Sequence, residues 1–534
     1  MIVERPPMGV NGSPPDGDAS PPATPLDAPP LALDPERMRA LGYRAVDALV
    51  ERWATLADGP PWVGAGRGEL ESARGSGGAA PDPAPDLAPD LAQDLAQDLA
   101  QDLAPSLAPS LALDPAPEEA EGPEAVLEAA LSGILPVAAR VDHPRFLAYV
   151  PSAPTWPSVL ADFLASGFNT FQGTWQGASA PSLVELEVLE WFRRWIGMPA
   201  GSSGLFTSGG SAANLLAVVA AREEAARSQE AAWRPSVYLS DQGHSSLLRA
   251  ARIAGIPAEG IRVLPTDAGL RLDPATVRTA LEADRAEGWT PILVAANGGA
   301  TNTGIVDPLD ALADLCAELG VHYHVDAAYG GFAVLNPEGA RALEGLGRAD
   351  SVTMDPHKWL FQPFECGCLL VRDPRLLVRA FRVTPEYLQD TLRGDEEVNF
   401  SERGLQLTRS FRALKVWMSV RSFGLGAFRE AIGGAMKLTR LAEARLRASA
   451  ELEVVTPASL GIVVWAARVS GDPEPLHRRI QEALTRDGTA FLTSTRIRGR
   501  HALRLCLLNP QLRATDIEDV ISAAEAVVRA ASTP

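Results

Sequence analysis

The chain of 534 residues is long enough for two or three packed domains, and its 46% hydrophobic and 22% charged residues are typical of a soluble globular protein. A net charge of −19 disfavours a nucleic-acid partner, because phosphate binding requires a basic surface. Four cysteines are too few for a disulfide framework, and no apolar run of about 18 residues predicts a membrane span. The N-terminus lacks the basic start and apolar core of a signal peptide, so we expect a cytoplasmic protein.

The N-terminal part is predicted to be helical but interrupted. Residues 1–33 are rich in Pro, Gly, Asp and Ala and predict a disordered tail. A helix is expected within 33–57, where an apolar face recurs at helical spacing: Met38, Leu41, Ala45, Leu49 and Trp53. The repeat PDLAPDLAQDLAQDLAQDLAPSLAPSLA at 85–112 could form a weak helical stripe, but its prolines interrupt it. We interpret it as part of an acidic low-complexity insertion, 66–121, that carries no chemistry.

From about residue 122, short β-rich segments alternate with helical ones. Six segments are predicted strands: 236–241, 261–266, 291–297, 321–329, 351–355 and 367–373. Helical stretches such as 247–255 and 307–320 lie between them. This alternation predicts an α/β fold with a mostly parallel sheet covered on both faces. Ligands in such sheets bind at the carboxyl ends of the strands.

We divide the chain after its tail into three parts. An N-terminal helical segment, 34–152, contains the insertion. A large domain, 153–428, holds the predicted sheet. A smaller α/β domain, 429–534, is expected after it, because strand-like and helical segments alternate again there.

The segment LFTSGGSAANLLAVVAAR, 205–222, runs from a Gly/Ser turn directly into a helical stretch. Backbone N–H groups at a helix N-terminus from Gly210 on, with the hydroxyls of Ser208 and Ser211, form an anion site. It is not a nucleotide P-loop, because the required Gly-Lys-Ser/Thr is missing. A plain capped helix after a turn is the alternative interpretation.

Polar residues end two other predicted strands. His244 is followed by two serines that can cap the next helix, although a lone histidine is more often a packed residue. Asp326 ends the run VHYHVDAAYGG, and a buried carboxylate there needs a partner. His322 and His324 alternate with Asp326 onto one strand face, but no further His/Cys cluster supports a metal site.

Lysine is rare in this chain, with three lysines against 45 arginines. Lys358, in SVTMDPHKWLFQPFE, again follows a predicted strand and has strongly apolar flanks. A lysine amine can lose its proton and act as a nucleophile, which arginine cannot. Lys415 and Lys437 lie in helical patterns and are expected on the solvent side.

An anion site, a ring that can stack, a buried carboxylate and a nucleophilic lysine together match one cofactor. Pyridoxal 5′-phosphate has a phosphate, a flat ring, a pyridine nitrogen that prefers a carboxylate partner, and an aldehyde. The sequence therefore predicts a pyridoxal-phosphate site.

Four motifs, SVTMDPHKWL, HVDAAYGG, SDQGHSS and RSFRALKVW, resemble the group II pyridoxal-phosphate decarboxylases, especially the aromatic-L-amino-acid decarboxylases. The resemblance runs from about residue 34 to the C-terminus, apart from the insertion. It implies the aspartate-aminotransferase-like fold (fold type I), a homodimer with its site at the subunit interface, and decarboxylation of an L-amino acid to an amine.

The resemblance also implies roles for single residues. Lys358 would hold the cofactor covalently, and Asp326 would pair with its ring nitrogen. His244 would stack on one face of the ring and Ala328 on the other. Positions around the phosphate or the substrate are matched by Gly210, Ser211, Thr301, Asp355 and His357. The segment 143–181 resembles the substrate pocket, to which it would contribute Tyr149, Val150, Pro151, Ser152 and Trp175.

One departure concerns the product. The family has a tyrosine 11 residues before the Phe of FRALK, where it protonates Cα, whereas this chain has Phe400. Relatives with phenylalanine there release an aldehyde, ammonia and hydrogen peroxide, so an aldehyde synthase is the alternative to a decarboxylase. His357 or a water could replace the missing acid, and Tyr387 is the nearest tyrosine. A non-catalytic binding protein is disfavoured, because the lysine, aspartate and histidine are all present.

Overall fold

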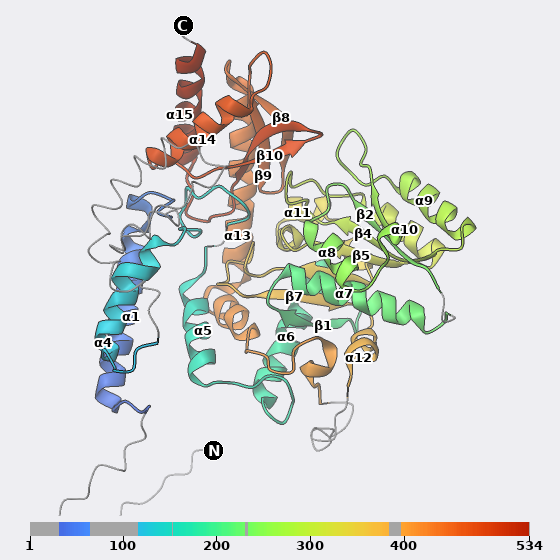
Figure 1. Cartoon of the computed structure of the whole chain (residues 1–534), viewed down its shortest axis with the longest axis horizontal. Coiled ribbons are helices and arrows are strands. Elements are labelled where there is room, and N and C mark those ends of the chain that lie inside the picture. The colour runs from blue at the N-terminus through green and yellow to red at the C-terminus, as the bar shows by residue number, and fades with distance from the viewer. Residues whose placement is uncertain (1–30, 65–115, 152, 230–232, 384–396, 533–534) are drawn as a thin grey trace, which may run out of the picture.

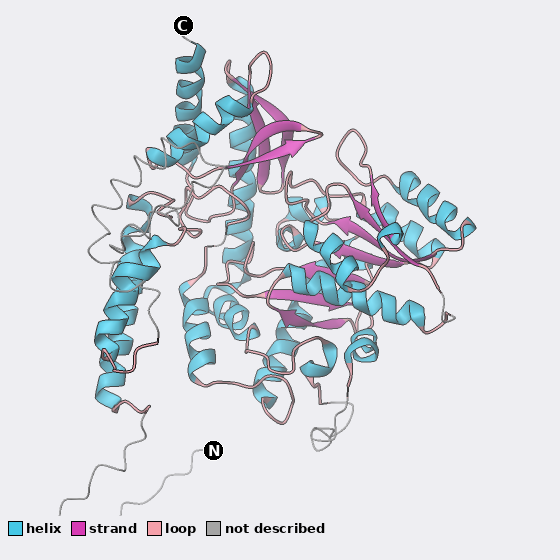
Figure 2. Ribbon diagram, in the orientation of Figure 1, coloured by secondary structure: helices cyan, strands magenta, loops and turns pink. Residues whose placement is uncertain are grey.

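The computed structural model describes residues 31–64, 116–151, 153–229, 233–383 and 397–532 (Figures 1 and 2). Most of the predicted tail and insertion lie outside these ranges, as do Ser152 and Tyr387. The described chain forms two sheets, one of seven strands and one of four. Within it, no helix combines the length and apolarity needed to cross a bilayer.

The larger sheet has the strand order β1-β7-β6-β5-β4-β2-β3. Its strands are β1 (Ser203–Thr207), β2 (Pro235–Ser240), β3 (Ile261–Leu264), β4 (Thr290–Asn297), β5 (His322–Asp326), β6 (Ser351–Met354) and β7 (Gly367–Val371). Strands β2 to β6 pair in parallel, and β7 runs antiparallel to β1 and β6. The sheet is mostly parallel, as predicted, and all six predicted strands are present. The edge strand β1 was missed, because its short run merges with the Gly/Ser turn.

Helices cover both faces of this sheet, as Figure 1 shows. One face carries α6 (Ser179–Ile196), α9 (Pro274–Ala286) and α10 (Leu309–Leu319), and the other carries α7 (Gly210–Ala226), α8 (Ser245–Ile253) and α12 (Arg375–Phe381). The short helix α11 (Pro337–Ala342) follows β5. Alternate strand residues serve the two sides: Val294 packs in the core below α9 and α10, and Leu293 in the core below α7 and α8. Both faces of the sheet are therefore shielded from water by helices, which explains why its strands are nearly continuous runs of apolar residues.

The smaller sheet is antiparallel, with strand order β10-β11-β9-β8. It contains β8 (Leu452–Ser459), β9 (Ile462–Ala467), β10 (Thr493–Ile497) and β11 (Arg500–Cys506), packed with α14 (Glu474–Arg486) and α15 (Ala514–Ser532). The helix α13 (Ala413–Ala448) joins the two sheets and runs across residue 428, where we placed a domain boundary. It departs from helical geometry at Gly424, whose φ of 71° suits glycine.

The N-terminal helices lie at one side of the molecule (Figure 1). They are α1 (Pro35–Thr55), α4 (Pro123–Ala129) and α5 (Trp156–Gly167). Helices α1 and α4 pair through Arg37 with Glu124 and Arg44 with Glu128. The following segment joins the smaller sheet: the Leu147 N–H donates to the Phe491 carbonyl at 3.0 Å, and its carbonyl accepts from the Cys506 N–H at 3.1 Å.

A buried ion pair ties the segment before α13 to the rest of the large domain. Arg409 lies 2.7 Å from Glu185 on α6, and the two side chains are 1% and 0% exposed. Glu185 also accepts from the Phe206 N–H at 2.9 Å, and Arg409 donates to the Phe206 carbonyl at 2.9 Å. The pair therefore connects α6, β1 and the start of α13.

We expect Glu185→Ala to lower the free energy of unfolding of the apoprotein by about 3–5 kcal/mol, because it leaves a buried guanidinium without its carboxylate. Replacing both partners by apolar residues, Glu185→Leu with Arg409→Met, should recover most of that loss. Chemical denaturation followed by tryptophan fluorescence measures both. Arg278→Ala, which removes an exposed pair with Glu318, is the control and should cost at most about 1 kcal/mol. Equal effects of Glu185→Ala and Arg278→Ala would contradict the assignment.

Candidate active site

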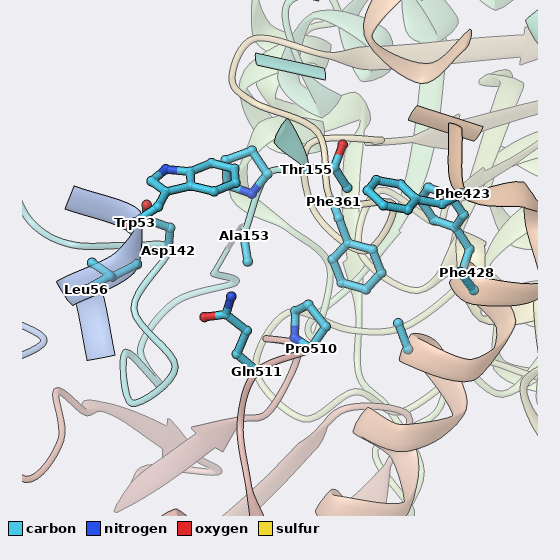
Figure 3. A pocket seen from close by; sticks show the side chains of 13 residues that line it. Trp53, Leu56, Asp142, Ala153, Thr155, Phe361, Phe423, Phe428, Pro510 and Gln511 are labelled. Carbon is cyan, nitrogen blue, oxygen red and sulfur yellow. The ribbon is translucent and has the colours of Figure 1, made fainter. Parts of the chain in front are cut away.

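A cavity of about 240 Å³ lies at the carboxyl ends of β4, β5 and β6, beside the N-terminus of α7. It is lined by these residues singled out in the sequence: Ser208, Gly210, Ser211, His244, Thr301, Asp326, Ala328, Asp355, His357 and Lys358. Segments from five different parts of the chain thus converge, because parallel strands end at one sheet edge. A second cavity, of about 230 Å³, lies between α1 and α13 and is shown in Figure 3. Asp142 is the one ionisable group among its described lining residues, so the chemistry belongs to the first cavity.

Lys358 lies in the turn that follows β6. Its backbone N–H donates to the Asp355 carbonyl at 2.9 Å, and its Nζ lies 2.9 Å from Asp355 Oδ2. Burial alone would lower the pKa of Lys358, but the Asp355 and Asp326 carboxylates outweigh it, and the pKa is raised above its ordinary value. The second oxygen of Asp355, Oδ1, is buried without a hydrogen-bond partner among the residues that the structure describes. The site therefore holds an amine whose charge depends on adjacent carboxylates.

His357 lines the same cavity with a defined tautomer. Its Nδ1 accepts a hydrogen bond from the Cys366 N–H at 3.0 Å, so the neutral ring carries its proton on Nε2. Nε2 lies 3.6 Å from Asp355 Oδ2. Burial lowers the pKa of His357, which favours the neutral form at pH 7. His357 therefore offers an N–H donor to the cavity.

Asp326 ends β5 on the face covered by α7 and α8. One oxygen accepts from Asn214 Nδ2 at 2.8 Å, and the other accepts from the Ala328 N–H at 3.2 Å. His244 caps α8, with its Nδ1 2.7 Å from Ser246 Oγ, and burial lowers the pKa of His244 although Asp326 opposes it. Asn214 and Ser246 also line the cavity and were missed in the sequence. The available signal for Asn214 was a polar residue in the apolar stretch four positions after Gly210.

The two histidines that alternate with Asp326 face a serine hydroxyl and not a set of further metal ligands. His322 Nε2 and His324 Nδ1 lie 2.8 and 2.9 Å from the same Ser351 hydroxyl. Within the described ranges, no group of three His, Cys, Asp or Glu residues could hold a metal ion.

Glycines keep the first turn of α7 open to the cavity. A Cβ on Gly210 would lie 2.8 Å from Asp355 Oδ2 and 3.0 Å from the Ala328 Cβ, and a Cβ on Gly209 would lie 3.1 Å from His357 Cε1. A side chain at either position would therefore fill this end of the cavity. The helix N-terminus and the nearby serine hydroxyls remain accessible to an anion.

Lys415 corrects one prediction. It is 3% exposed rather than on the solvent side, whereas Lys437 is exposed as predicted. Its Nζ pairs with Asp162 at 3.0 Å and donates to the carbonyls of Phe364 and Glu365 at 3.2 and 3.3 Å. Lys415 thus supports the loop that carries Glu365 into the cavity lining.

The other predicted site residues that the structure describes do not line the cavity of their own chain. Phe400 is 0% exposed in a short 3₁₀ helix, with the guanidinium of Arg409 4.8 Å from its ring centre. Tyr149 is exposed, and its φ is 49°. The others are Val150, Pro151 and Trp175, which are half-buried or buried, and Ser152, which lies outside the described residues. None of those that the structure describes lines the cavity that holds Lys358.

The cavity fits pyridoxal phosphate. The accessible helix N-terminus and hydroxyls suit its phosphate, and the unpartnered Asp355 oxygen and the Lys358 amine lie nearby. Asp326 is available to a ring nitrogen, with His244 and Ala328 in the same lining. The residues predicted to bind the cofactor are thus assembled in one place.

Known proteins are similar to this chain in sequence and in fold. Residues 106–468 match the pyridoxal-dependent decarboxylase conserved domain. An aromatic-L-amino-acid decarboxylase of Bacillus atrophaeus is 39% identical over 422 residues, covering 78% of this chain and 88% of that one. A phenylacetaldehyde synthase of Arabidopsis thaliana is 32% identical, covering 74% and 84%. The crystal structure of Oryza sativa TDC with PLP and tryptamine superposes with a TM-score of 0.80 at 27% identity, covering 94% and 99%.

These likenesses confirm fold type I, the cofactor and the reaction class predicted from the sequence. The protein is an enzyme that uses pyridoxal phosphate to decarboxylate an amino acid. The chain belongs to the pyridoxal-dependent decarboxylase family.

Proposed function

We propose that the enzyme decarboxylates an aromatic L-amino acid to the corresponding amine. The observation that carries this proposal is the convergence of Lys358, Asp355, Asp326 and His244 on one cavity. The net reaction breaks the bond between Cα and the carboxylate, releases carbon dioxide and places a proton on Cα. Pyridoxal phosphate, when bound, accepts the electron pair that this cleavage leaves behind.

The residues of this chain would bind, orient and protonate. Lys358 would hold the cofactor covalently, Asp326 would keep a proton on the ring nitrogen, and His244 would lie against the ring. The first turn of α7 would bind the phosphate. His357, whose neutral ring carries its proton on Nε2, would hold a water that gives its proton to Cα, and a positioned proton donor typically contributes about 10²–10⁴-fold.

An aromatic rather than an acidic substrate side chain is favoured by the cavity lining. Its described residues include no arginine that could pair with an acidic side chain. Two of the similar proteins support this choice, since one is named for aromatic amino acids and the other is a structure that holds tryptamine.

We expect Lys358→Ala and Lys358→Arg to reduce amine formation to the uncatalysed level, because neither side chain can form the covalent link. After treatment with borohydride, peptide mass spectrometry should find the reduced cofactor on Lys358 of the wild type and on no peptide of the two variants. Lys437→Ala replaces an exposed lysine and should behave as the wild type. A cofactor fixed to another lysine, or full activity of Lys358→Arg, would contradict the assignment.

A second candidate function is supported by Phe400 and by the likeness to phenylacetaldehyde synthase. An aldehyde synthase would convert the amino acid, oxygen and water to the aldehyde, carbon dioxide, ammonia and hydrogen peroxide. We rank this function second, because the Phe400 ring is 0% exposed and packs against Arg403 and Arg409, so it is not available to a cavity of either subunit.

We therefore expect the wild type, incubated in air with tryptophan, tyrosine, DOPA, phenylalanine, histidine or glutamate, to form an aromatic amine without peroxide. Phe400→Tyr should leave that product unchanged, because a water held by His357, rather than position 400, supplies the proton. Mass spectrometry of the products, with assays for ammonia and peroxide, measures both. Aldehyde with equal ammonia and peroxide from the wild type, shifting to amine in Phe400→Tyr, would establish the second function.

We further propose that the enzyme is a homodimer that uses the side of α1 and α5. The amphipathic helix α1 buries none of its residues, and Tyr43 is 64% exposed. On α5 and just after it, Phe163 and Phe168 are 67% and 82% exposed. Neighbouring exposed apolar side chains of this size mark an interaction surface. A partner would also explain why residues predicted for the substrate pocket do not reach the cavity of their own chain.

A dimer is expected to have about twice the chain mass of 56.6 kDa in analytical ultracentrifugation. Phe163→Glu with Phe168→Glu should shift the population towards the monomer and reduce activity, because two charges would be buried. Ile253→Glu, at an equally exposed apolar residue on α8, should remain dimeric. A monomeric wild type, or dissociation by Ile253→Glu alone, would contradict the proposed surface.

A further inference from the structure

The most fully engaged polar side chain beneath the cavity is Asn214, on the second turn of α7. It is 1% exposed, and its amide makes four hydrogen bonds. Nδ2 donates to Asp326 Oδ2 at 2.8 Å and to Ser246 Oγ at 2.9 Å. Oδ1 accepts from Thr353 Oγ1 at 2.7 Å and lies 3.1 Å from His324 Nε2. The full donor and acceptor capacity of one amide is therefore used.

The orientation of this amide is fixed by charge. An ionised carboxylate only accepts hydrogen bonds, so the NH₂ group must face Asp326 and the carbonyl oxygen must face His324. His324 then has to donate from Nε2. Burial lowers the pKa of His324 to about 4, so the ring is neutral and its Nδ1 accepts from the Ser351 hydroxyl. The same hydroxyl then accepts from His322 Nε2.

The other branch of the network reaches His244. Ser246 Oγ accepts one N–H of Asn214, which leaves its own proton for His244 Nδ1 at 2.7 Å. The Ser246 backbone N–H also donates to Nδ1, at 3.3 Å. A ring nitrogen that accepts twice carries no proton, so neutral His244 holds its proton on Nε2. The amide is thus connected, directly or through Ser246, to a ring at the N-cap of α8 and a ring on β5, as well as donating to Asp326.

We propose that Asn214 is the positioning residue of this active site: its amide holds one oxygen of Asp326, leaves the carboxylate ionised for the cofactor, and keeps His244 as the Nε2–H tautomer. This inference rests on the roles proposed above for Asp326 and His244. Asn214 is not proposed to contact the substrate or the cofactor, and it acts through Asp326 and His244.

Two substitutions separate this role from packing. Asn214→Asp keeps the shape of the side chain but puts a second carboxylate where the amide donated to Asp326, so the two must share a proton. Asn214→Leu keeps approximate volume and removes all four hydrogen bonds. We expect both variants to bind pyridoxal phosphate about 10- to 100-fold more weakly, the loss that accompanies removal of a hydrogen bond to a charged group. If Asn214 only fills space, Asn214→Asp will bind the cofactor within about two-fold of the wild type, and the proposal fails.

Cofactor affinity is measured by quenching of tryptophan fluorescence, and the absorbance of the bound cofactor is titrated against pH. The titration of Asn214→Asp should shift, because a neutralised Asp326 no longer supports the protonated ring nitrogen. Tyr238→Phe is the matched control, since it deletes one buried hydrogen bond to a carboxylate, Asp284, away from the cavity. It should reduce the melting temperature of the apoprotein without changing affinity or the titration.

A measurement on the wild-type apoprotein tests the same inference without any variant, should these not fold. The chain has seven histidines, and ¹⁵N-histidine labelling with long-range ¹H–¹⁵N correlation reports the tautomer of each ring. We expect His244, His322 and His324 to carry their protons on Nε2. A proton on Nδ1 of His244 or His324 would overturn the proposal. Neither this measurement nor cofactor binding uses a substrate, so their outcome is independent of whether the product is an amine.

Discussion

The burial of two carboxylates beside an amine at one sheet edge is the constraint on which this active site depends. Asp326 and Asp355 are both almost inaccessible to water, and both carboxylates raise the pKa of Lys358. Desolvating a charge costs several kcal/mol unless partners compensate. The compensation comes from hydrogen bonds of Asn214 and the Ala328 N–H, from the lysine itself, and from the open first turn of α7. Parallel strands bring these residues together, because neighbouring strands end at the same sheet edge and each contributes one residue.

The scarcity of lysine becomes understandable in these terms. Positive charge on the surface of this chain comes mainly from arginine, with Lys437 an exposed exception. The other two lysines, one partly buried and one buried, meet different requirements. Lys358 needs an amine that can react, while Lys415 needs a compact ammonium that fits among backbone carbonyl oxygens, where a planar guanidinium would be too large.

The sequence predicted the larger sheet and the chemistry of its edge well, for physical reasons. Buried parallel strands give continuous apolar runs, and Lys358, Asp326 and His244 each follow such a run, so their convergence could be expected. Asn214 could not be recognised, because its importance depends on partners from three other elements. The burial of Lys415 could not be predicted, because a helical pattern alone does not show which side chains are exposed to solvent. The location of Phe400 likewise depends on the guanidinium groups packed against it, which no local spacing reveals.

The pairing of Leu147 with Phe491 and Cys506 has a consequence for how the chain is made. The smaller sheet is built from residues near the C-terminus, yet an earlier segment is hydrogen-bonded to the start of β10 and the end of β11, with Tyr149 lying 344 residues before its partner Thr493. A contact of such separation closes a very long loop and forms late in folding. During synthesis, the segment around Leu147 therefore remains without these partners until almost the whole chain has left the ribosome. The acidic character of the chain helps to keep such intermediates apart, because like charges oppose association.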